Sequence, residues 1–197
     1  MTLAISETQE NILRLAADYA SEYGLNDLSI GKLAASAKMS KAGLHGSFGS
    51  KMDLQLNTIR YAAEIFRQRV IGPAMELDTG PRRTLAFCRG WLEYIDRKVF
   101  PGGCFFTRVS MEGGSLADSV NKEIRKQFQS FRRFLSTELS KGIGHTKANR
   151  QSYILADQLL ALVISYNWAL HSIRNQDAAR HIRDLLFDRF DLISKSN

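Results

Sequence analysis

The chain has 197 residues, of which 44% are hydrophobic and 24% are charged. This composition is that of an ordinary globular protein and excludes disordered and collagen-like chains. The formal net charge of +7 favours a polyanionic partner without naming one. Pro73, Pro81 and Pro101 are the only prolines, so nothing forbids helix before or after this region. We therefore expect an all-α fold.

The first 71 residues predict four helices, each beginning at a serine whose side chain can accept a hydrogen bond from the first turn. The expected helices span residues 6–23, 29–36, 40–46 and 50–71. Ser6 and Gln9 have the spacing of a capping box at the start of the first helix. The segment therefore predicts three short helices followed by a longer one that leads away from them.

Five further helices are expected beyond Pro73, at residues 82–98, 104–111, 115–139, 153–170 and 176–194. The fourth of these is apolar at 14 of its 18 positions, so most of its circumference must be covered. It also contains Asp157 and Asn167, which favours a buried helix over a membrane span. We infer that the last two helices pair with their copies in a second chain, which predicts a homodimer.

Residues 29–51 carry the strongest functional pattern. Two short helices joined by a turn at about residues 37–39 have the length of a helix-turn-helix. The acid-free stretch between Asp27 and Asp53 suits a phosphate backbone. It contains four lysines, Lys32, Lys38, Lys41 and Lys51. A small core is expected beneath the two helices, formed by Leu33, Leu44 and Phe48.

The order and spacing of residues 12–54 resemble the DNA-binding domain of TetR-type transcriptional repressors. The shared features include IleLeuArgLeuAlaAla at 12–17, Gly24, Ser29, Ile30, Leu33, Ala34, Ala37, MetSerLys at 39–41, Leu44, Phe48, SerLys at 50–51 and Leu54. The resemblance implies a helix-turn-helix DNA-binding domain at residues 1–50 and a larger helical domain at residues 51–197 that binds an effector and dimerises. It implies a ligand-responsive repressor that binds a palindromic operator in double-stranded DNA and is released by a small molecule.

By position in the motif, the expected phosphate-backbone contacts are Ser29, Ser40 and Lys51. The residues expected to face the major groove are Lys41, Ala42, Gly43 and His45. Family members usually have Gly at 38, GlyThr at 42–43, Tyr at 45 and His at 47, whereas this chain has Lys38, Ala42, Gly43, His45 and Ser47. The aromatic ring that often contacts the backbone is therefore missing, and the phosphate contacts fall to lysines and His45. The alternative is an ordinary helical corner with a solvated lysine face.

Aromatic side chains gather in the helices beyond Pro73, and most of them are expected to form core. The family resemblance implies an effector pocket among these helices, and small-molecule sites are mostly apolar clefts with a few polar groups. The expected lining residues are Trp91, Phe128 and Trp168.

The segment 101–114 resembles a GlyGlyCys segment in one branch of TetR-type regulators, in which a nearby cysteine senses electrophiles. Gly102 and Gly103 can place Cys104 at a helix N-terminus, with Arg108 one turn further on, and both features favour the thiolate. Cys104 is therefore the fourth expected effector residue, and a thiol-based electrophile or redox sensor is the alternative function. The competing interpretation is that Cys104 is a small buried residue.

Other classes of function find less support in the sequence. The four histidines show no metal-ligand spacing and no GxSxG motif occurs, so we expect no catalytic residue, no metal and no cofactor. Two cysteines are too few for a disulfide framework, and the first ten residues do not have the pattern of a secretory signal, so we expect a cytoplasmic protein. Basic pairs at 125–126 and 132–133 suggest a membrane-surface or partner-binding helix. At helical spacing such charges more often form a solvated face, so no membrane partner is expected.

Overall fold

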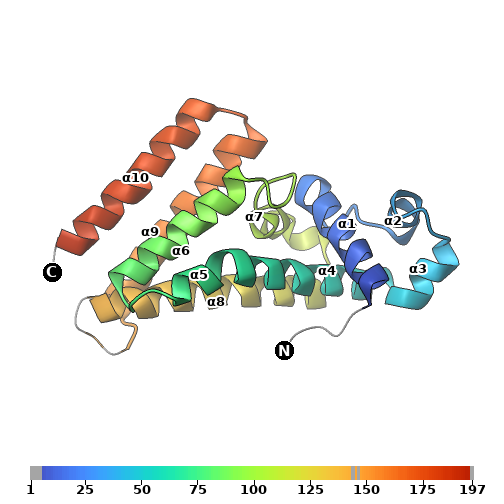
Figure 1. The fold of residues 1–197 in the computed structure, drawn as a ribbon, viewed down its shortest axis with the longest axis horizontal. Helices are drawn as coiled ribbons and strands as arrows, with labels where there is room; N and C mark the ends of the chain where they lie inside the picture. Colours follow the sequence, from blue (N-terminus) through green and yellow to red (C-terminus); the bar gives the residue numbers. More distant parts are fainter. Residues whose placement is uncertain (1–5, 143–144, 146, 196–197) are drawn as a thin grey trace. The chain divides into compact units, whose positions relative to one another are not determined.

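The computed structural model describes residues 6–142, 145 and 147–195, and these residues form helices without any β-strand (Figure 1). The all-α prediction is confirmed. The chain divides into two compact units, one of residues 1–66 and 98–126 and the other of residues 67–97 and 127–197. Each unit therefore combines two separate stretches of sequence. The assignment of DNA binding to residues 1–50 and of sensing to residues 51–197 stays a prediction.

The first unit contains the three short helices expected at the N-terminus. Its elements are α1 (Glu7–Tyr23), α2 (Ile30–Ser36), α3 (Lys41–Phe48), α4 (Lys51–Phe66), α7 (Phe105–Ser110), the 3₁₀ turn η2 (Gly113–Ser115) and the first part of α8 (Asp118–Gly142). The predicted capping box at α1 is present, because the Ser6 side chain accepts a hydrogen bond from Gln9 N–H and the Gln9 side chain accepts one from Ser6 N–H.

The core of the first unit lies where α1 packs against α4 and α7. Alanines at 16, 17 and 20 of α1 are buried, and their small side chains let the neighbouring helices approach closely. Phe66 at the end of α4 meets Phe106 of α7 edge to face, with ring centroids 6.0 Å apart. Segments 40 residues apart in sequence thus form one core.

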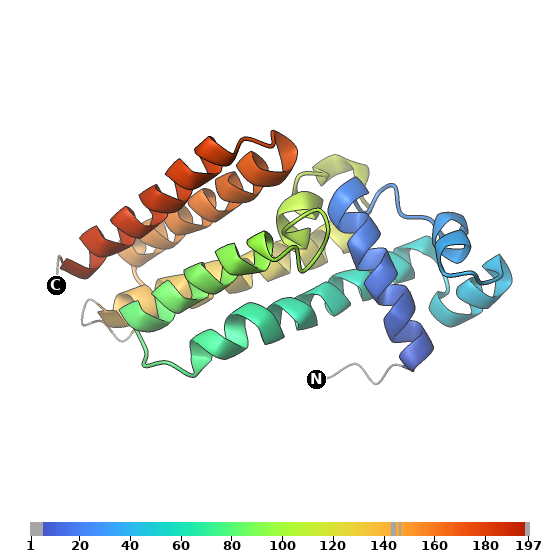
Figure 2. The ribbon, with the colours of Figure 1, turned by 45° about the horizontal axis from the view of Figure 1, so that its top comes forward.

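The second unit is a bundle around an aromatic cluster. Its elements are the π-helical turn η1 (Arg67–Ile71), α5 (Gly72–Met75), α6 (Pro81–Asp96), the rest of α8, α9 (Arg150–Asn167), the π-helical turn η3 (Trp168–Ser172) and α10 (Gln176–Lys195). The ring of Trp91 packs against Phe87 at 5.6 Å and against Phe131 at 5.2 Å. Figure 2 shows α9 and α10 side by side, as their packing requires.

Several helix boundaries differ from the sequence prediction by two or three residues; for example, α9 begins at Arg150 instead of residue 153, and α8 ends at Gly142 instead of residue 139. Two other differences have an identifiable physical reason. The helix that begins at Lys51 continues through η1 and α5, and Pro73 lies in the first turn of α5 instead of ending the helix. The wider π turn just before Pro73 accommodates a residue that has no N–H to donate and whose ring would clash in a regular helix. The helix expected to start at Ser115 begins at Asp118, because residues 113–115 form the 3₁₀ turn and the Ser115 hydroxyl donates back to Glu112 O.

Candidate nucleic-acid interface

The turn between α2 and α3 has the geometry of a helix-turn-helix. α2 ends in a Schellman motif, in which Lys38 N–H donates to Ala35 O (3.3 Å) and Met39 N–H donates to Ala34 O (3.0 Å). Lys38 adopts a left-handed conformation with φ of 54°. The chain then turns into α3, where the Ser40 side chain accepts a hydrogen bond from Gly43 N–H at 3.0 Å.

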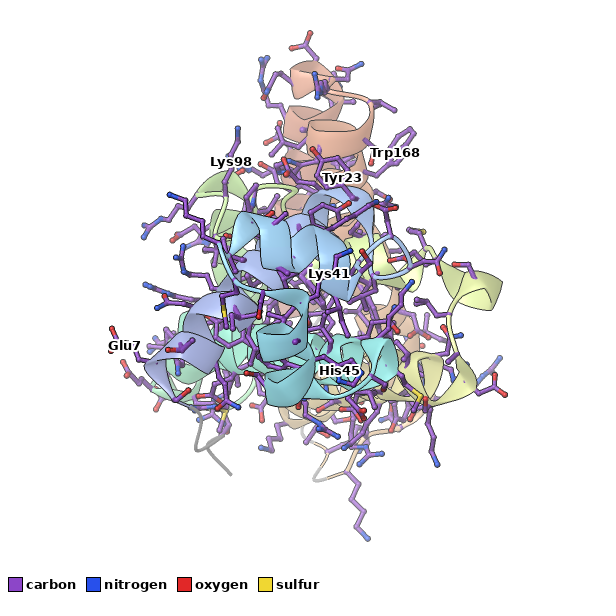
Figure 3. The ribbon with its side chains drawn as sticks, turned by 90° about the vertical axis from the view of Figure 1, so that its right-hand side faces the viewer. Glu7, Tyr23, Lys41, His45, Lys98 and Trp168 are labelled. Carbon is purple, nitrogen blue, oxygen red and sulfur yellow. The ribbon has the colours of Figure 1, made fainter. Side chains whose placement is uncertain are left out.

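The α2–α3 pair sits on the small core that the sequence predicts. Leu33, Leu44 and Phe48 are buried, at 3%, 0% and 7% exposure. The opposite side of α3 faces solvent, because Ser40, Lys41, Ala42, Gly43 and His45 are all exposed. Figure 3 shows Lys41 where α2 and α3 meet and His45 further along α3. The predicted groove-facing residues therefore share one accessible surface.

Two glycines, Gly31 of α2 and Gly46 of α3, leave space at this surface that a side chain would otherwise fill. A Cβ at Gly31 of α2 would lie 3.3 Å from Cε of Lys41, so the Lys41 side chain extends across the first turn of α2. A Cβ at Gly46 would meet no atom within 4 Å. The exposed side of α3 thus carries only small residues beside Lys41 and His45, which would let its backbone approach the base edges of a major groove closely.

The positive charge of the acid-free stretch is smaller than its four lysines suggest. Lys32 forms an ion pair with Asp27 at 2.6 Å and also donates to the hydroxyl of Tyr19 at 3.2 Å. Tyr19 donates to the same Asp27 carboxylate. Hydrogen bonds from Lys32 and then from Tyr19 hold the pKa of Asp27 below its ordinary value. In the described part of the chain Lys38, Lys41 and Lys51 form no ion pair with an acid, so these three carry the local positive charge.

Lys51 lies in the first turn of α4, and its Nζ donates to the backbone carbonyl of Asn26 at 2.5 Å. The loop between α1 and α2 is therefore one partner of this expected phosphate ligand. Ser29, the other residue expected near the backbone besides Ser40, is half-buried and accepts a hydrogen bond from Lys32 N–H at 3.2 Å. Its hydroxyl hydrogen remains available to donate to a phosphate.

The net positive charge of the chain belongs mostly to the second unit. That unit contains 16 Lys and Arg against 10 Asp and Glu, whereas the first unit contains 11 against 10. The total charge is therefore a poor guide to the nucleic-acid surface. The electrostatics of this surface depend on where Lys38, Lys41 and Lys51 lie, not on an overall excess of positive charge.

Sequence reasoning missed two side chains that hold the α1–α2 loop. Glu112, in the turn after α7, accepts hydrogen bonds from the N–H groups of Leu25 and Asn26, both at 2.7 Å. Gln55 of α4 is buried and donates to Leu25 O at 2.6 Å. No local pattern marks either residue, because each acts across a long separation in sequence.

The four expected effector residues fall into different surroundings. Trp91 is buried and Phe128 half-buried, and both contact Phe131, with ring centroids 5.2 and 5.9 Å away. Trp168 is 49% exposed in η3. Cys104 belongs to the first unit, is 0% exposed and precedes the buried Phe105 and Phe106. The structure therefore brings Trp91 and Phe128 to one cluster and places the other two elsewhere.

The second unit also has an open hollow of about 290 Å³ between α6, α9 and α10. Its polar side is a network in which Tyr166 donates to Asp96 and Arg183 donates to both. Burial, followed by the hydrogen bond with Asp96, raises the pKa of Tyr166 to about 12, so the phenol stays protonated. The described residues contain no group of three or more His, Cys, Asp or Glu side chains that could hold a metal.

A two-helix DNA-reading motif on a compact core, followed by a second helical unit, is the architecture of a helix-turn-helix transcriptional regulator. Two sequence families match the chain. Residues 12–56 match the family described as bacterial regulatory proteins of the tetR family, and residues 80–186 match the tetracyclin repressor-like C-terminal domain. The second match alone covers more than half of the chain. The chain therefore belongs to the TetR family of transcriptional regulators.

Solved structures have the same fold. A TetR regulator from Legionella pneumophila is 19% identical with a TM-score of 0.80 and covers 94% of this chain and 98% of its own. One from Chloroflexus aurantiacus is 21% identical with a TM-score of 0.80 and coverages of 91% and 92%. AibR, solved with isovaleryl coenzyme A and operator DNA, is 20% identical with a TM-score of 0.67 and coverages of 83% and 85%. No curated protein matches the chain.

Proposed function

We propose that this regulator is a homodimeric, ligand-responsive repressor that binds a near-palindromic operator through α3 of each copy and leaves it when a small molecule binds. The observation that carries the proposal is the accessible face of α3, on which Lys41, Ala42, Gly43 and His45 lie above a buried core. AibR, which has this fold, was solved with both an acyl coenzyme A and operator DNA. The place of action is DNA in the cytoplasm, and the proposal includes no catalytic step.

Base recognition is assigned to Lys41 and His45, and phosphate contact to Ser29, Ser40 and Lys51. Two copies of α3 should enter successive major grooves about 34 Å apart or a multiple of that distance. Lys41→Ala should reduce the discrimination between bases at one operator position by roughly 1–3 kcal/mol of binding free energy. The assay is binding to duplexes substituted at each position. An equal loss on operator and random duplexes would instead make Lys41 a phosphate contact.

Dimerisation is assigned to α9 and α10. Each helix exposes a large apolar side chain, Ile154 of α9 at 39% and Leu185 of α10 at 56% exposure. The segment Arg150–Ser172 is long and apolar enough to cross a membrane by composition alone, and 44% of its most apolar window is buried within the chain. A two-fold pairing with the same helices of a second copy would cover the remainder.

The dimer proposal is tested by two neighbouring leucines. Leu185→Glu should give a monomer in sedimentation with weakened operator binding, whereas Leu186 is 0% exposed, so Leu186→Glu reports on folding instead. A wild-type monomer that binds its operator tightly would overturn the proposal. Flotation with anionic vesicles distinguishes DNA binding from the membrane-surface alternative. A repressor should bind the operator duplex and should not float with the vesicles.

Effector release is assigned to the second unit, with Trp91, Phe128 and Trp168 as the proposed contacts. Linkage requires the operator to weaken effector binding by the same factor by which the effector weakens operator binding. Calorimetry of an effector with and without operator measures both factors, and identical affinities would exclude the proposal. The two tryptophans give a second test, which is the quenching of tryptophan fluorescence by a bound effector. If Trp91→Phe loses the quenching and Trp168→Phe keeps it, the effector binds at the buried cluster of Trp91 and Phe128.

A further inference from the structure

The linker between α1 and α2 is fixed by side chains from distant parts of the first unit. The N–H groups of Leu25 and Asn26 donate to the two carboxylate oxygens of Glu112. The carbonyls of the same two residues accept from Gln55 Nε2 and Lys51 Nζ. All four backbone polar groups of these two linker residues are therefore bonded to side chains, although Asn26 is exposed and could use water instead.

Glu112 is itself seated closely against the linker. Gly24 has φ of 92°, and a Cβ there would lie 2.8 Å from Cδ of Glu112, so only glycine admits the carboxylate at this position. The same part of the chain contacts the end of α1 at two more points. Gly102 N–H donates to the Ser21 hydroxyl at 3.0 Å, and Arg108 Nε donates to Glu22 O at 3.3 Å. We call Gly102, Arg108 and Glu112 the clasp.

The clasp connects two parts of the chain that match different families. Lys51 and Gln55 lie in the range matched by the N-terminal DNA-binding family, whereas Glu112 lies in the range matched by the C-terminal domain. The linker leads directly into Ser29, the residue that caps α2. Glu112 is therefore the point at which the C-terminal sequence fixes the backbone that enters the helix-turn-helix.

We propose that Glu112 is a positioning residue for operator binding, which sets the entry of α2 through its two hydrogen bonds to the linker and does not touch DNA. Hydrogen bonds to a charged acceptor are stronger than neutral ones, so their loss releases the linker. When only a fraction of the molecules holds α2 in place, the apparent dissociation constant rises in inverse proportion to that fraction. The part of this inference that concerns DNA rests on the proposed function.

The sign of the effect separates positioning from electrostatics. Removal of a carboxylate raises the net charge by one, which by itself strengthens attraction to phosphates. Positioning predicts the opposite for Glu112→Ala, namely an operator affinity about tenfold weaker. Glu112→Gln keeps one acceptor oxygen, so its operator affinity should lie between that of Glu112→Ala and that of the wild type. Asp118→Asn, at an exposed acid in the first turn of α8, is the matched control and should bind as tightly as wild type or more tightly.

The experiment combines binding with hydrogen exchange on the full-length protein. The duplex is one that the wild type selects from a random-sequence pool. Glu112→Ala should speed exchange of the Leu25 and Asn26 amides, because the open form of the linker becomes more populated, with exchange in α4 unchanged. Unaltered exchange with wild-type affinity would overturn the proposal, as would faster exchange throughout the unit, which indicates general destabilisation. If the wild type selects no duplex, the proposed function fails, and the exchange comparison alone decides on the clasp.

Discussion

Lys38 closes α2 in a conformation that favours glycine, so Lys38→Gly should stabilise the first unit. Its φ of 54° lies in the left-handed region, and the Schellman hydrogen bonds of Lys38 and Met39 hold it there. A residue with a Cβ pays about 1–2 kcal/mol in this region. Glycine has more conformational freedom in the unfolded chain, and this offsets about 0.5–1 kcal/mol of the gain from removing the strain. The net gain should be about 0.5–1 kcal/mol, or about 2 °C in Tm for a chain of this size.

Urea unfolding of three proteins measures this gain. Lys38→Ala removes the same charge as Lys38→Gly but keeps the strained Cβ, so the difference between the two variants isolates the backbone term. Both variants should lose DNA affinity equally and flatten its salt dependence by about one charge, because both lose the same ammonium group. Equal stability of the alanine and glycine variants would refute the conformational argument.

Three further predictions follow from contacts in the two units. Asp27→Asn should free Lys32 for phosphates and so tighten binding to random duplexes and steepen its salt dependence by about one charge, whereas unchanged binding would mean that the ion pair does not mask Lys32. Gly102→Ala would place a Cβ 2.0 Å from Ser21 O and should cost about 1–3 kcal/mol, while Gly46→Ala meets no atom within 4 Å and should gain about 0.5–1 kcal/mol in the same urea assay. Burial raises the pKa of Glu138, but hydrogen bonds from Gly80 N–H and Lys141 lower it by more. A lowered folded-state pKa gives stability that is present above about pH 4 and lost as the pH falls. In Glu138→Gln the free energy of unfolding should therefore fall less steeply as the pH is lowered through this range.

The helices and the DNA-reading motif could be predicted because they depend on neighbouring residues. Ser6, Ser29, Ser40 and Ser50 each accept a hydrogen bond from the first turn of a helix that begins at the next residue. Leu33, Leu44 and Phe48 follow from helical spacing. The π turn before Pro73 could not be predicted, because the sequence there shows only a proline that normally ends a helix.

The roles of individual charged residues could not be predicted, because they depend on contacts across the fold. An acid-free stretch of sequence places Lys32 and Lys51 together on a phosphate surface, yet Asp27 and the carbonyl of Asn26 bind them in the structure. Glu112 acts 86 and 87 residues away from its partners. Sequence spacing thus predicts a candidate surface but not the residues that position it.

The last prediction concerns the two thiols. Burial raises the pKa of Cys88 to about 12, so at pH 7 only about one molecule in 10⁵ carries the thiolate that reacts with electrophiles. Cys104 is equally buried, and Arg108, expected beside it, donates to Glu22 O. Cys104 lies in the short segment that carries the clasp, after Gly102 and Gly103, whereas Cys88 lies within α6.

A short segment opens more readily than a packed helix, so a mild alkylating agent should modify Cys104 of the native protein faster than Cys88. Glu112→Ala should raise the rate at Cys104 alone, because it loosens the contacts that hold this segment. If Cys104 serves as a sensor, its modification must also lower operator affinity, and Cys104→Ser must bind operator without responding. A Cys104 that reacts no faster than Cys88, or reacts without releasing the operator, is a packing residue, and the effector is then a reversibly bound molecule.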